Sequence, residues 1–249
     1  IDARTGKIAS AETLVRWVHP TKGILPPADF LETAANVGIL KQVDEIVFAG
    51  LKSAMSTFDE AGVDLPRAAI NVSAARLMDP TFIHDIRSSG ISPDRLTIEI
   101  LESVYLDRLG DMIRWTIDEL NEIGGKIALD DFGTGHASVS GLLEIRPSIL
   151  MIDRSFIQPI VDDRSKYPLV ASIVGIGKSL GMSIVAEGVE TEDHARVVSE
   201  LGCDYLQGYF FGRPMSAEDL KDLLTETGGM LWPKAASYVW TSFPSYEQR

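Results

Sequence analysis

The chain has 249 residues, of which 45% are hydrophobic and 24% are charged, and its formal net charge is −13. This length allows one barrel-sized domain or two smaller ones, and so acidic a composition argues against a general binder of DNA or RNA backbones. The single cysteine, Cys203, excludes an internal disulfide and a cysteine-based zinc site. No apolar run approaches the ~20 residues that a membrane span needs, and the first residues do not resemble a signal peptide.

The first 60 residues predict two strands and a long helix. A short strand over 1–2 leads through a turn to a second strand over 8–17, which carries Glu12. A loop with Gly23 and several prolines follows. Apolar residues then recur every three or four positions from Leu40 to Phe58, which indicates an amphipathic helix.

After Gly62 the pattern becomes a regular alternation of strands and helices. The expected strands are 68–70, 96–98, 126–129, 148–152, 182–186 and 205–206, and the expected helices are 81–87, 111–123, 169–180, 191–201 and 217–224. Such alternation predicts parallel strands joined by right-handed crossovers. With the strands of the first segment the total is eight, which suits an α/β fold of the closed, TIM-like (β/α)8 barrel type. An open doubly wound sheet is the alternative, and it would spread the strand ends along a crevice.

Polar residues stand where these apolar strands end, and one acid lies inside the strand over 8–17. They are Glu12, Asn71, Glu99, Asp130, Asp131, Glu187 and Gln207. In a barrel the carboxyl ends of the strands meet on one face, where active sites lie. Carboxylate and amide oxygens suit Mg²⁺, Mn²⁺ or Ca²⁺, whereas the four histidines lack metal-ligand spacing. The alternative is that these acids are separate helix caps and surface charges.

Asp130 and Asp131 are adjacent and could serve two metal ions, with one carboxylate bridging them. The following Gly133-Thr134-Gly135 is not a phosphate-binding loop, because no Gly-Lys-Ser/Thr follows it. It is a tight loop after a strand, and it could move to cover a site. Arg16 would share a strand face with Glu12 and could bind a phosphate, or it forms a surface salt bridge.

Six ordered motifs resemble those of one known family. They are Glu12-Thr13-Leu14-Val15-Arg16-Trp17, Ile70-Asn71-Val72-Ser73, Glu99-Ile100-Leu101-Glu102, Asp130-Asp131-Phe132-Gly133-Thr134-Gly135, Ala186-Glu187-Gly188-Val189-Glu190-Thr191 and Gln207-Gly208-Tyr209. Over residues 1 to about 225 the chain resembles the EAL domain family of cyclic di-GMP phosphodiesterases. Thr13 and Leu101 depart from the family pattern, which has Ala and Thr at these positions.

The resemblance implies a barrel variant with an antiparallel first strand, and a site with two Mg²⁺ or Mn²⁺ ions that Ca²⁺ inhibits. By resemblance, one ion is held by Glu12, Asn71, Glu99 and Asp130, and the second by Asp131 and Glu187, with Glu187 also assigned as a base. The implied reaction opens cyclic di-GMP to linear pGpG.

The resemblance also assigns roles around the metal ions. Leu14 and Arg16 would contact the nucleotide, and Gln207 would order the site. Glu102 would anchor the loop that begins at Asp130, which in the family lies near a dimer contact, so a homodimer is expected.

One departure bears directly on activity. The family has a lysine where this chain has Met151, and an aspartate where it has Ser148. The lysine helps position the attacking water in the family, and Met cannot donate a hydrogen bond. Three hypotheses therefore stay open: a phosphodiesterase with impaired turnover, a receptor that binds cyclic di-GMP without hydrolysing it, and a protein-interaction domain that binds no nucleotide.

The chain starts at Ile1 rather than Met. We expect a C-terminal piece of a longer signalling protein, with a sensory or GGDEF-type domain upstream and any membrane anchor there, so that this part is cytoplasmic. The barrel domain is expected over 1–227. The extension over 228–249 would pack on the barrel as an added element or contact a partner.

Overall fold

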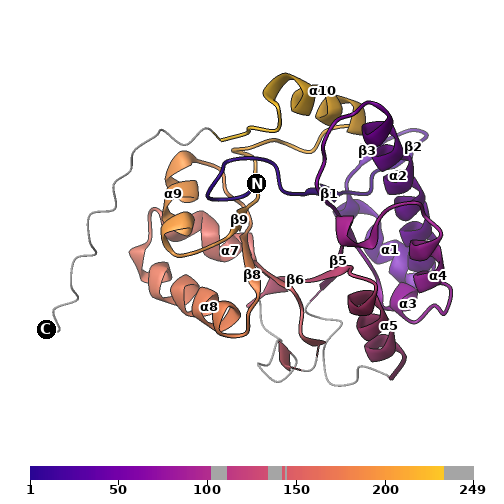
Figure 1. The fold of residues 1–249 in the computed structure, drawn as a ribbon, viewed down its shortest axis with the longest axis horizontal. Helices are drawn as coiled ribbons and strands as arrows, with labels where there is room; N and C mark the ends of the chain where they lie inside the picture. Colours follow the sequence, from indigo (N-terminus) through magenta and orange to yellow (C-terminus); the bar gives the residue numbers. More distant parts are fainter. Residues whose placement is uncertain (102–110, 134–141, 144, 233–249) are drawn as a thin grey trace, which may run out of the picture.

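The computed structural model describes residues 1–101, 111–133, 142–143 and 145–232. Its centre is a curled sheet of seven parallel strands, in the order β1-β4-β5-β6-β7-β8-β9 (Figure 1). The strands are β1 Ala11–Thr13, β4 Ala68–Asn71, β5 Leu96–Leu101, β6 Lys126–Phe132, β7 Ile149–Ile152, β8 Ser183–Ala186 and β9 Tyr205–Leu206. The predicted α/β class and parallel alternation are confirmed.

The N-terminal residues run antiparallel to the last strand. Asp2 forms an antiparallel bridge with Tyr205. The Ile1 amino group donates to the Leu206 carbonyl at 2.8 Å, and the Leu206 N–H donates back to the Ile1 carbonyl at 2.9 Å. The antiparallel first strand that was expected is therefore present as this short pairing beside β9.

The strand expected over 8–17 is wrong in its extent. The chain leaves the central sheet after Thr13, and Trp17–His19 forms a separate strand, β2, that pairs antiparallel with β3, Gly23–Leu25. The turn between β2 and β3 is stabilised by the His19 side chain, whose Nδ1 accepts from the N–H groups of Thr21 and Lys22. Arg16 lies between β1 and β2, so strand periodicity does not place it beside Glu12.

Helices α1 to α5 lie beside one half of the sheet and α7 to α9 beside the other (Figure 1). Along the chain they are α1 Leu31–Asn36, α2 Leu40–Glu60, α3 Ala74–Leu77, α4 Phe82–Arg87, α5 Asp111–Glu122, α7 Arg154–Ile157, α8 Tyr167–Ser179, α9 Glu192–Glu200 and α10 Ala217–Thr227. Short 3₁₀ turns occupy Pro27–Asp29, Pro93–Arg95, Gln158–Ile160 and Arg164–Lys166. Side-chain caps begin several helices: Thr191 accepts from the His194 N–H, and Ser216 forms a capping box with Asp219.

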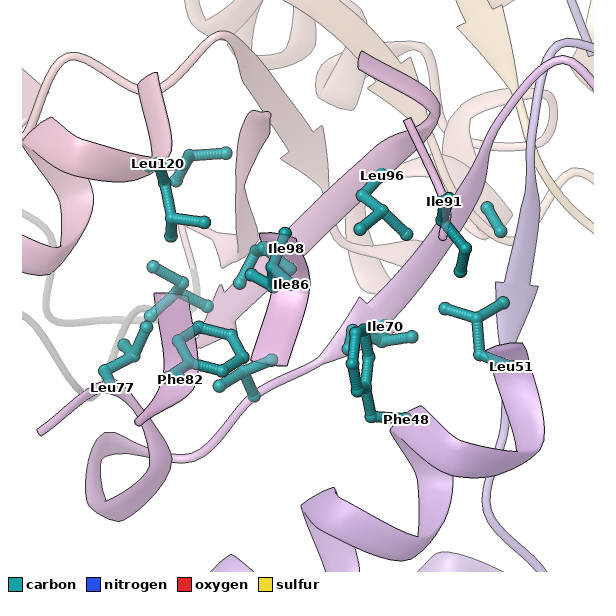
Figure 2. Close-up of a cluster of buried hydrophobic side chains, with 14 of the residues drawn as sticks. Phe48, Leu51, Ile70, Leu77, Phe82, Ile86, Ile91, Leu96, Ile98 and Leu120 are labelled. Carbon is teal, nitrogen blue, oxygen red and sulfur yellow. The ribbon is translucent and has the colours of Figure 1, made fainter. Parts of the chain in front are cut away.

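Burial of apolar side chains attaches these helices to the convex face of the sheet. Figure 2 shows Phe48 of α2, Phe82 of α4 and Leu120 of α5 around Ile70 and Ile98 of the neighbouring strands, all of them buried. Successive side chains of a strand point to opposite faces. Because Ile98 faces the helices, its neighbours on β5 face the inside of the curl, where the polar residues gather.

Candidate functional site

Four of the predicted residues are joined by hydrogen bonds inside the curl. The Asn71 amide, at the end of β4, donates from Nδ2 to Glu12 Oε1 at 2.7 Å and to Glu99 Oε2 at 3.2 Å. Gln207, which follows β9, donates from Nε2 to Glu12 Oε2 at 2.8 Å. The bond between Gln207 and Glu12 joins the two edges of the sheet, β9 and β1. The sheet therefore curls far enough to bring these edges together.

Three further carboxylates form a compact group beside the first. Asp130, Asp131 and Glu187 each offer an oxygen atom, and these atoms all lie within 4.8 Å of one another. Among the described residues, this is the group of acidic, cysteine or histidine side chains arranged closely enough to hold a metal ion. The structure thus brings together the acids expected from β6 and β8.

A backbone irregularity lets both aspartates serve this group. In a regular strand, consecutive side chains point to opposite faces. Here β6 continues past Asp130 to Phe132, and its register against β7 shifts between Leu129 and Phe132. Asp131 has a φ of 58°, in the left-handed region that Asp tolerates better than most residues, and its N–H donates to Asp130 Oδ1 at 2.7 Å.

Burial and mutual repulsion act together on these carboxyl groups. Glu99 is 3% exposed, and burial followed by the charges of Glu12, Asp130 and Glu187 raises its pKa well above the usual value. Burial, and then the charge of Asp131, raises the pKa of Asp130 to about 7. Burial, and then the charge of Asp130, raises the pKa of Glu187 to about 9.

The donor set fits a hard divalent cation. The ligands on offer are oxygen atoms alone, which suit Mg²⁺ or Mn²⁺. Burial and mutual repulsion raise the pKa values of Asp130 and Glu187, so protons bind more readily here than at an exposed carboxylate, and a bound cation would replace them. The acidic cluster could therefore bind metal, with Asp130, Asp131 and Glu187 at its centre.

The residues expected to contact a nucleotide lie at the edge of the group. Leu14 is 40% exposed. Arg16 is exposed and donates from Nη1 to the Val15 carbonyl at 2.8 Å, while its charge acts to lower the pKa of Glu12, which burial raises. Glu102, with the Thr134-Gly135 part of the following loop, lies outside the described residues.

Met151 faces the inside of the curl, below the carboxylates. It is 3% exposed and packs with Ala128, Ile149 and Val185. It also lines a cavity that Glu99 borders. The methionine supplies only apolar contact there.

Asp153 belongs to this electrostatic environment, although it was not among the predicted site residues. Its charge raises the pKa of both Asp130 and Glu187, after larger contributions from burial and from nearer acids. Its side chain also caps α7 by accepting from the Ser155 N–H. The signal for it was available, since Asp153 follows β7 as Glu187 follows β8.

Comparison with known proteins assigns the family. The sequence model of one family, described as "EAL domain", matches residues 1–214. The chain belongs to the EAL domain family. Its relatives include the bifunctional diguanylate cyclase/cyclic di-GMP phosphodiesterase MucR of Pseudomonas aeruginosa, which is 35% identical over 222 residues that make up 88% of this chain and 32% of MucR.

Another relative is the oxygen sensor protein DosP of Escherichia coli, 31% identical over 88% of this chain and 28% of DosP. This EAL domain chain thus spans about a third of the length of these curated relatives. Among solved structures, the MucR phosphodiesterase in complex with c-di-GMP matches with a TM-score of 0.76 at 36% identity, over 84% of this chain and 86% of that one.

An EAL domain protein from Listeria monocytogenes matches with a TM-score of 0.77 at 28% identity, over 91% of this chain and 90% of that one. The TIM-like barrel expectation is confirmed by these likenesses. A helix long and apolar enough to cross a membrane is absent from the described part of the chain.

Proposed function

We propose that this EAL domain hydrolyses cyclic di-GMP to linear pGpG in a reaction that depends on Mg²⁺ or Mn²⁺. The observation that carries the proposal is the group formed by Asp130, Asp131 and Glu187, whose oxygen atoms lie within 4.8 Å of one another in a chain of this family. Since the chain spans only part of its relatives, we infer that it works inside a longer signalling protein.

Six residues of this chain would hold the cations. Glu12, Asn71, Glu99 and Asp130 would hold one divalent cation, and Asp131 with Glu187 a second. When bound, such a pair activates water and stabilises the charge of a phosphodiester undergoing in-line displacement.

Further roles are assigned to Glu187 itself and to three residues beside the group. Glu187 would take up the proton of the attacking water, which requires its carboxylate to be ionised, and a neighbouring cation provides that condition. Arg16 would pair with a phosphate and Leu14 would contact a base. The Gln207 amide keeps Glu12 oriented through its 2.8 Å hydrogen bond.

The direct test is incubation of the protein with cyclic di-GMP and Mg²⁺ or Mn²⁺, with the products separated by chromatography. Formation of pGpG that stops on addition of a chelator supports the proposal. Asp131→Asn should abolish the product, whereas Asp193→Asn, at an exposed position on α9, should not change it. Intact cyclic di-GMP after long incubation with either metal would contradict hydrolysis.

A receptor function is the second candidate, and Met151 is the observation that favours it. Its side chain is buried beneath the carboxylates and cannot donate a hydrogen bond to an attacking water. Loss of a positioned proton-handling group commonly lowers the rate by about 10²–10⁴-fold. Calorimetric titration with cyclic di-GMP in the presence of Ca²⁺ measures binding separately from turnover.

A matched pair of substitutions at position 151 separates the two candidates. Met151→Lys should raise the hydrolysis rate by about 10²-fold or more if the missing ammonium group limits turnover, and Met151→Leu should leave the rate unchanged. Equal rates in the two variants would show that the residue at 151 does not decide turnover. Absence of binding heat in the wild-type protein would exclude both nucleotide functions.

A further inference from the structure

A cavity of about 60 Å³ lies inside the curled sheet, and Glu12 and Glu99 of the acidic site contribute to its lining. The corresponding layer of a TIM-like barrel is usually filled by bulky branched side chains. Here Ala69 and Ala128 contribute to the lining of the cavity, and their small side chains leave the space open. Met151 and Val185 border it on the opposite strands.

Two hydroxyl groups of this cavity have no hydrogen-bond partner among the described residues. They are Thr97 Oγ1 and Ser10 Oγ, both inaccessible to solvent, and Thr97 as a whole is 3% exposed. A buried hydroxyl without a partner is costly, so native structures usually satisfy it with protein or with ordered water. Both residues line the cavity.

The position of these hydroxyls relates them to the carboxylates above. Thr97 is two residues before Glu99 on β5, so the two side chains lie on the same face of that strand, and Ser10 directly precedes β1, two residues before Glu12. Glu12 and Glu99 also border the cavity. Each hydroxyl without a partner and the carboxyl group two residues after it therefore border the same cavity.

We propose that this cavity is a buried-water site, and that its water joins the Thr97 and Ser10 hydroxyls to the Glu99 and Glu12 carboxylates. The volume exceeds the roughly 10–15 Å³ that one water requires, and the lining supplies the two to four polar partners that a buried water needs. A hydroxyl can donate to the water, and the water can donate one proton to an oxygen atom of each carboxyl group, which can accept it whether the group is ionised or protonated.

Thr97 and Ser10 are then positioning residues. Groups that hydrogen-bond to metal-binding side chains fix their orientation, and loss of one typically lowers metal affinity by about 10–100-fold. This second step rests on the proposed metal-dependent function, whereas the presence of water in the cavity does not.

Two substitutions at position 97 test the proposal. Thr97→Val keeps the shape of the side chain and removes the hydroxyl, and Thr97→Ser keeps the hydroxyl. Calorimetric titration with Mn²⁺ should show about tenfold weaker binding to Thr97→Val and nearly wild-type binding to Thr97→Ser. Thermal unfolding without metal serves as the folding control, and both variants should retain a single cooperative transition.

A high-resolution crystal structure of the wild-type protein decides the hydration step independently. Electron density for water within hydrogen-bond distance of Thr97 Oγ1 supports the proposal, and an empty or collapsed cavity overturns it. Wild-type affinity for Mn²⁺ in Thr97→Val, or equal losses in both variants, overturns the positioning role. A wild-type protein that binds no Mn²⁺ would instead contradict the proposed function and with it that role, while the water density would still decide the hydration of the cavity.

Discussion

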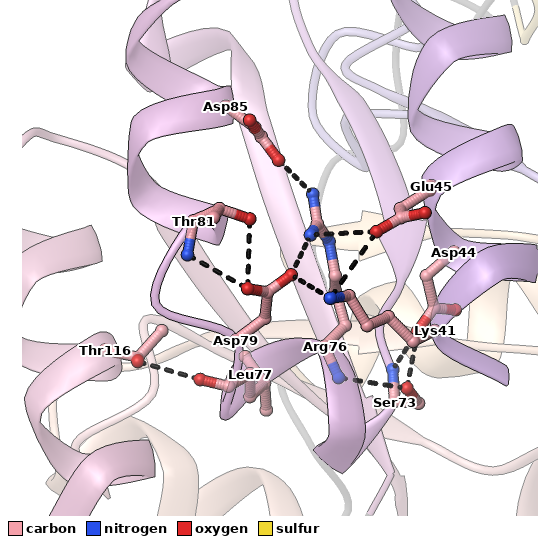
Figure 3. Close-up of polar contacts among 10 residues, drawn as sticks. All are labelled: Lys41, Asp44, Glu45, Ser73, Arg76, Leu77, Asp79, Thr81, Asp85 and Thr116. Atoms are coloured by element: carbon pink, nitrogen blue, oxygen red, sulfur yellow. Dashed lines mark hydrogen bonds and ion pairs between the residues drawn. The ribbon is translucent and has the colours of Figure 1, made fainter. Parts of the chain in front are cut away.

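Two groups of acidic side chains in this molecule differ in the charges that surround them. The first group surrounds the buried Arg76, and we call Arg76, Asp79, Asp85 and Lys41 the paired cluster (Figure 3). The Arg76 guanidinium contacts Asp79 and lies 2.6 Å from Asp85. Lys41 of α2 adds a second cation at 3.0 Å from Asp79. Burial alone would raise the pKa of Asp79, but hydrogen bonds from Thr81 and Lys41 hold it well below its usual range.

The second group, the strand-end carboxylates of Glu12, Glu99, Asp130, Asp131 and Glu187, has raised rather than lowered pKa values at Glu99, Asp130 and Glu187. The main charged neighbours of Glu99 are Glu12, Asp130 and Glu187, all of the same sign, and the pKa of Glu99 is raised in consequence of burial and of these charges. Acids that are paired with cations within the chain stabilise the fold. Acids that surround one another oppose folding unless protons or cations from outside neutralise them, which indicates a binding function. The predictions below test this contrast.

Removal of charge from the paired cluster should destabilise the protein most. Asp79→Asn leaves Arg76, whose side chain is 2% exposed, with one anion fewer. Breaking a buried ion pair costs about 3–5 kcal/mol, and we expect about 3 kcal/mol of unfolding free energy because Asp85 stays in place. Urea unfolding followed by circular dichroism measures the loss, with Asp222→Asn, at a 66% exposed position, as the control.

The pH dependence gives a second measurement on the same variant. Because the pKa of Asp79 is lower in the folded protein than in the unfolded chain, its stabilisation is full above pH ~4 and is lost as the pH falls. The stabilities of the wild-type protein and Asp79→Asn should therefore converge in acid. A constant difference from pH 7 to pH 3, or a loss below 1 kcal/mol at pH 7, would contradict this account.

The same Asp-to-Asn change at the strand ends should act on cation binding. Asp130→Asn removes one of the three carboxylates that lie within 4.8 Å of one another, and we expect Mn²⁺ affinity to fall by at least about 100-fold, because even an indirect partner of a metal ligand contributes 10–100-fold. Isothermal titration with Mn²⁺ measures the change, with Asp193→Asn as the control. Unchanged affinity would show that the acidic group is not the metal site.

Asp130→Asn should also stabilise the metal-free protein, opposite in sign to Asp79→Asn. The pKa of Asp130 is raised to about 7, so the folded protein favours its protonated form and loses stability as the pH rises through that value. Asparagine carries no such charge. In the presence of a chelator we expect Asp130→Asn to be roughly 1–3 kcal/mol more stable at pH 8.5 and little different at pH 5. A variant less stable than wild type at pH 8.5 would refute the argument from repulsion.

Much of the strand-end group was predictable because strand periodicity is local. The alternation of apolar strands and helices placed Asn71, Glu99 and Glu187 at one end of a parallel sheet, and the structure brings them together. The roles of Asp130 and Asp131 depend on more, since the register shift of β6 arises from its pairing with β7. A single sequence carries no local sign of that shift, and the predicted strand therefore ended too early.

Other features could not be predicted because they depend on distant neighbours. The Thr97 hydroxyl could be assigned to the inner face from its spacing to Glu99. Its lack of a partner could not, because that depends on the small size of Ala69 and Ala128 on adjacent strands. In the paired cluster, likewise, Asp79 contacts both Arg76 of α3 and Lys41 of α2. Pairing of that kind is visible only once the chain has folded.

The smallest effect is expected at the exposed edge of the paired cluster. The Lys41 side chain is 43% exposed, and its ammonium lies 3.0 Å from Asp79. Solvent screens such a pair, so Lys41→Met should lower the free energy of unfolding by no more than about 1 kcal/mol. Urea unfolding beside Asp79→Asn makes the comparison. If Lys41→Met cost as much as Asp79→Asn, the cluster would be held by its exposed lysine, and burial of Arg76 would not be the reason why these acids stabilise the fold.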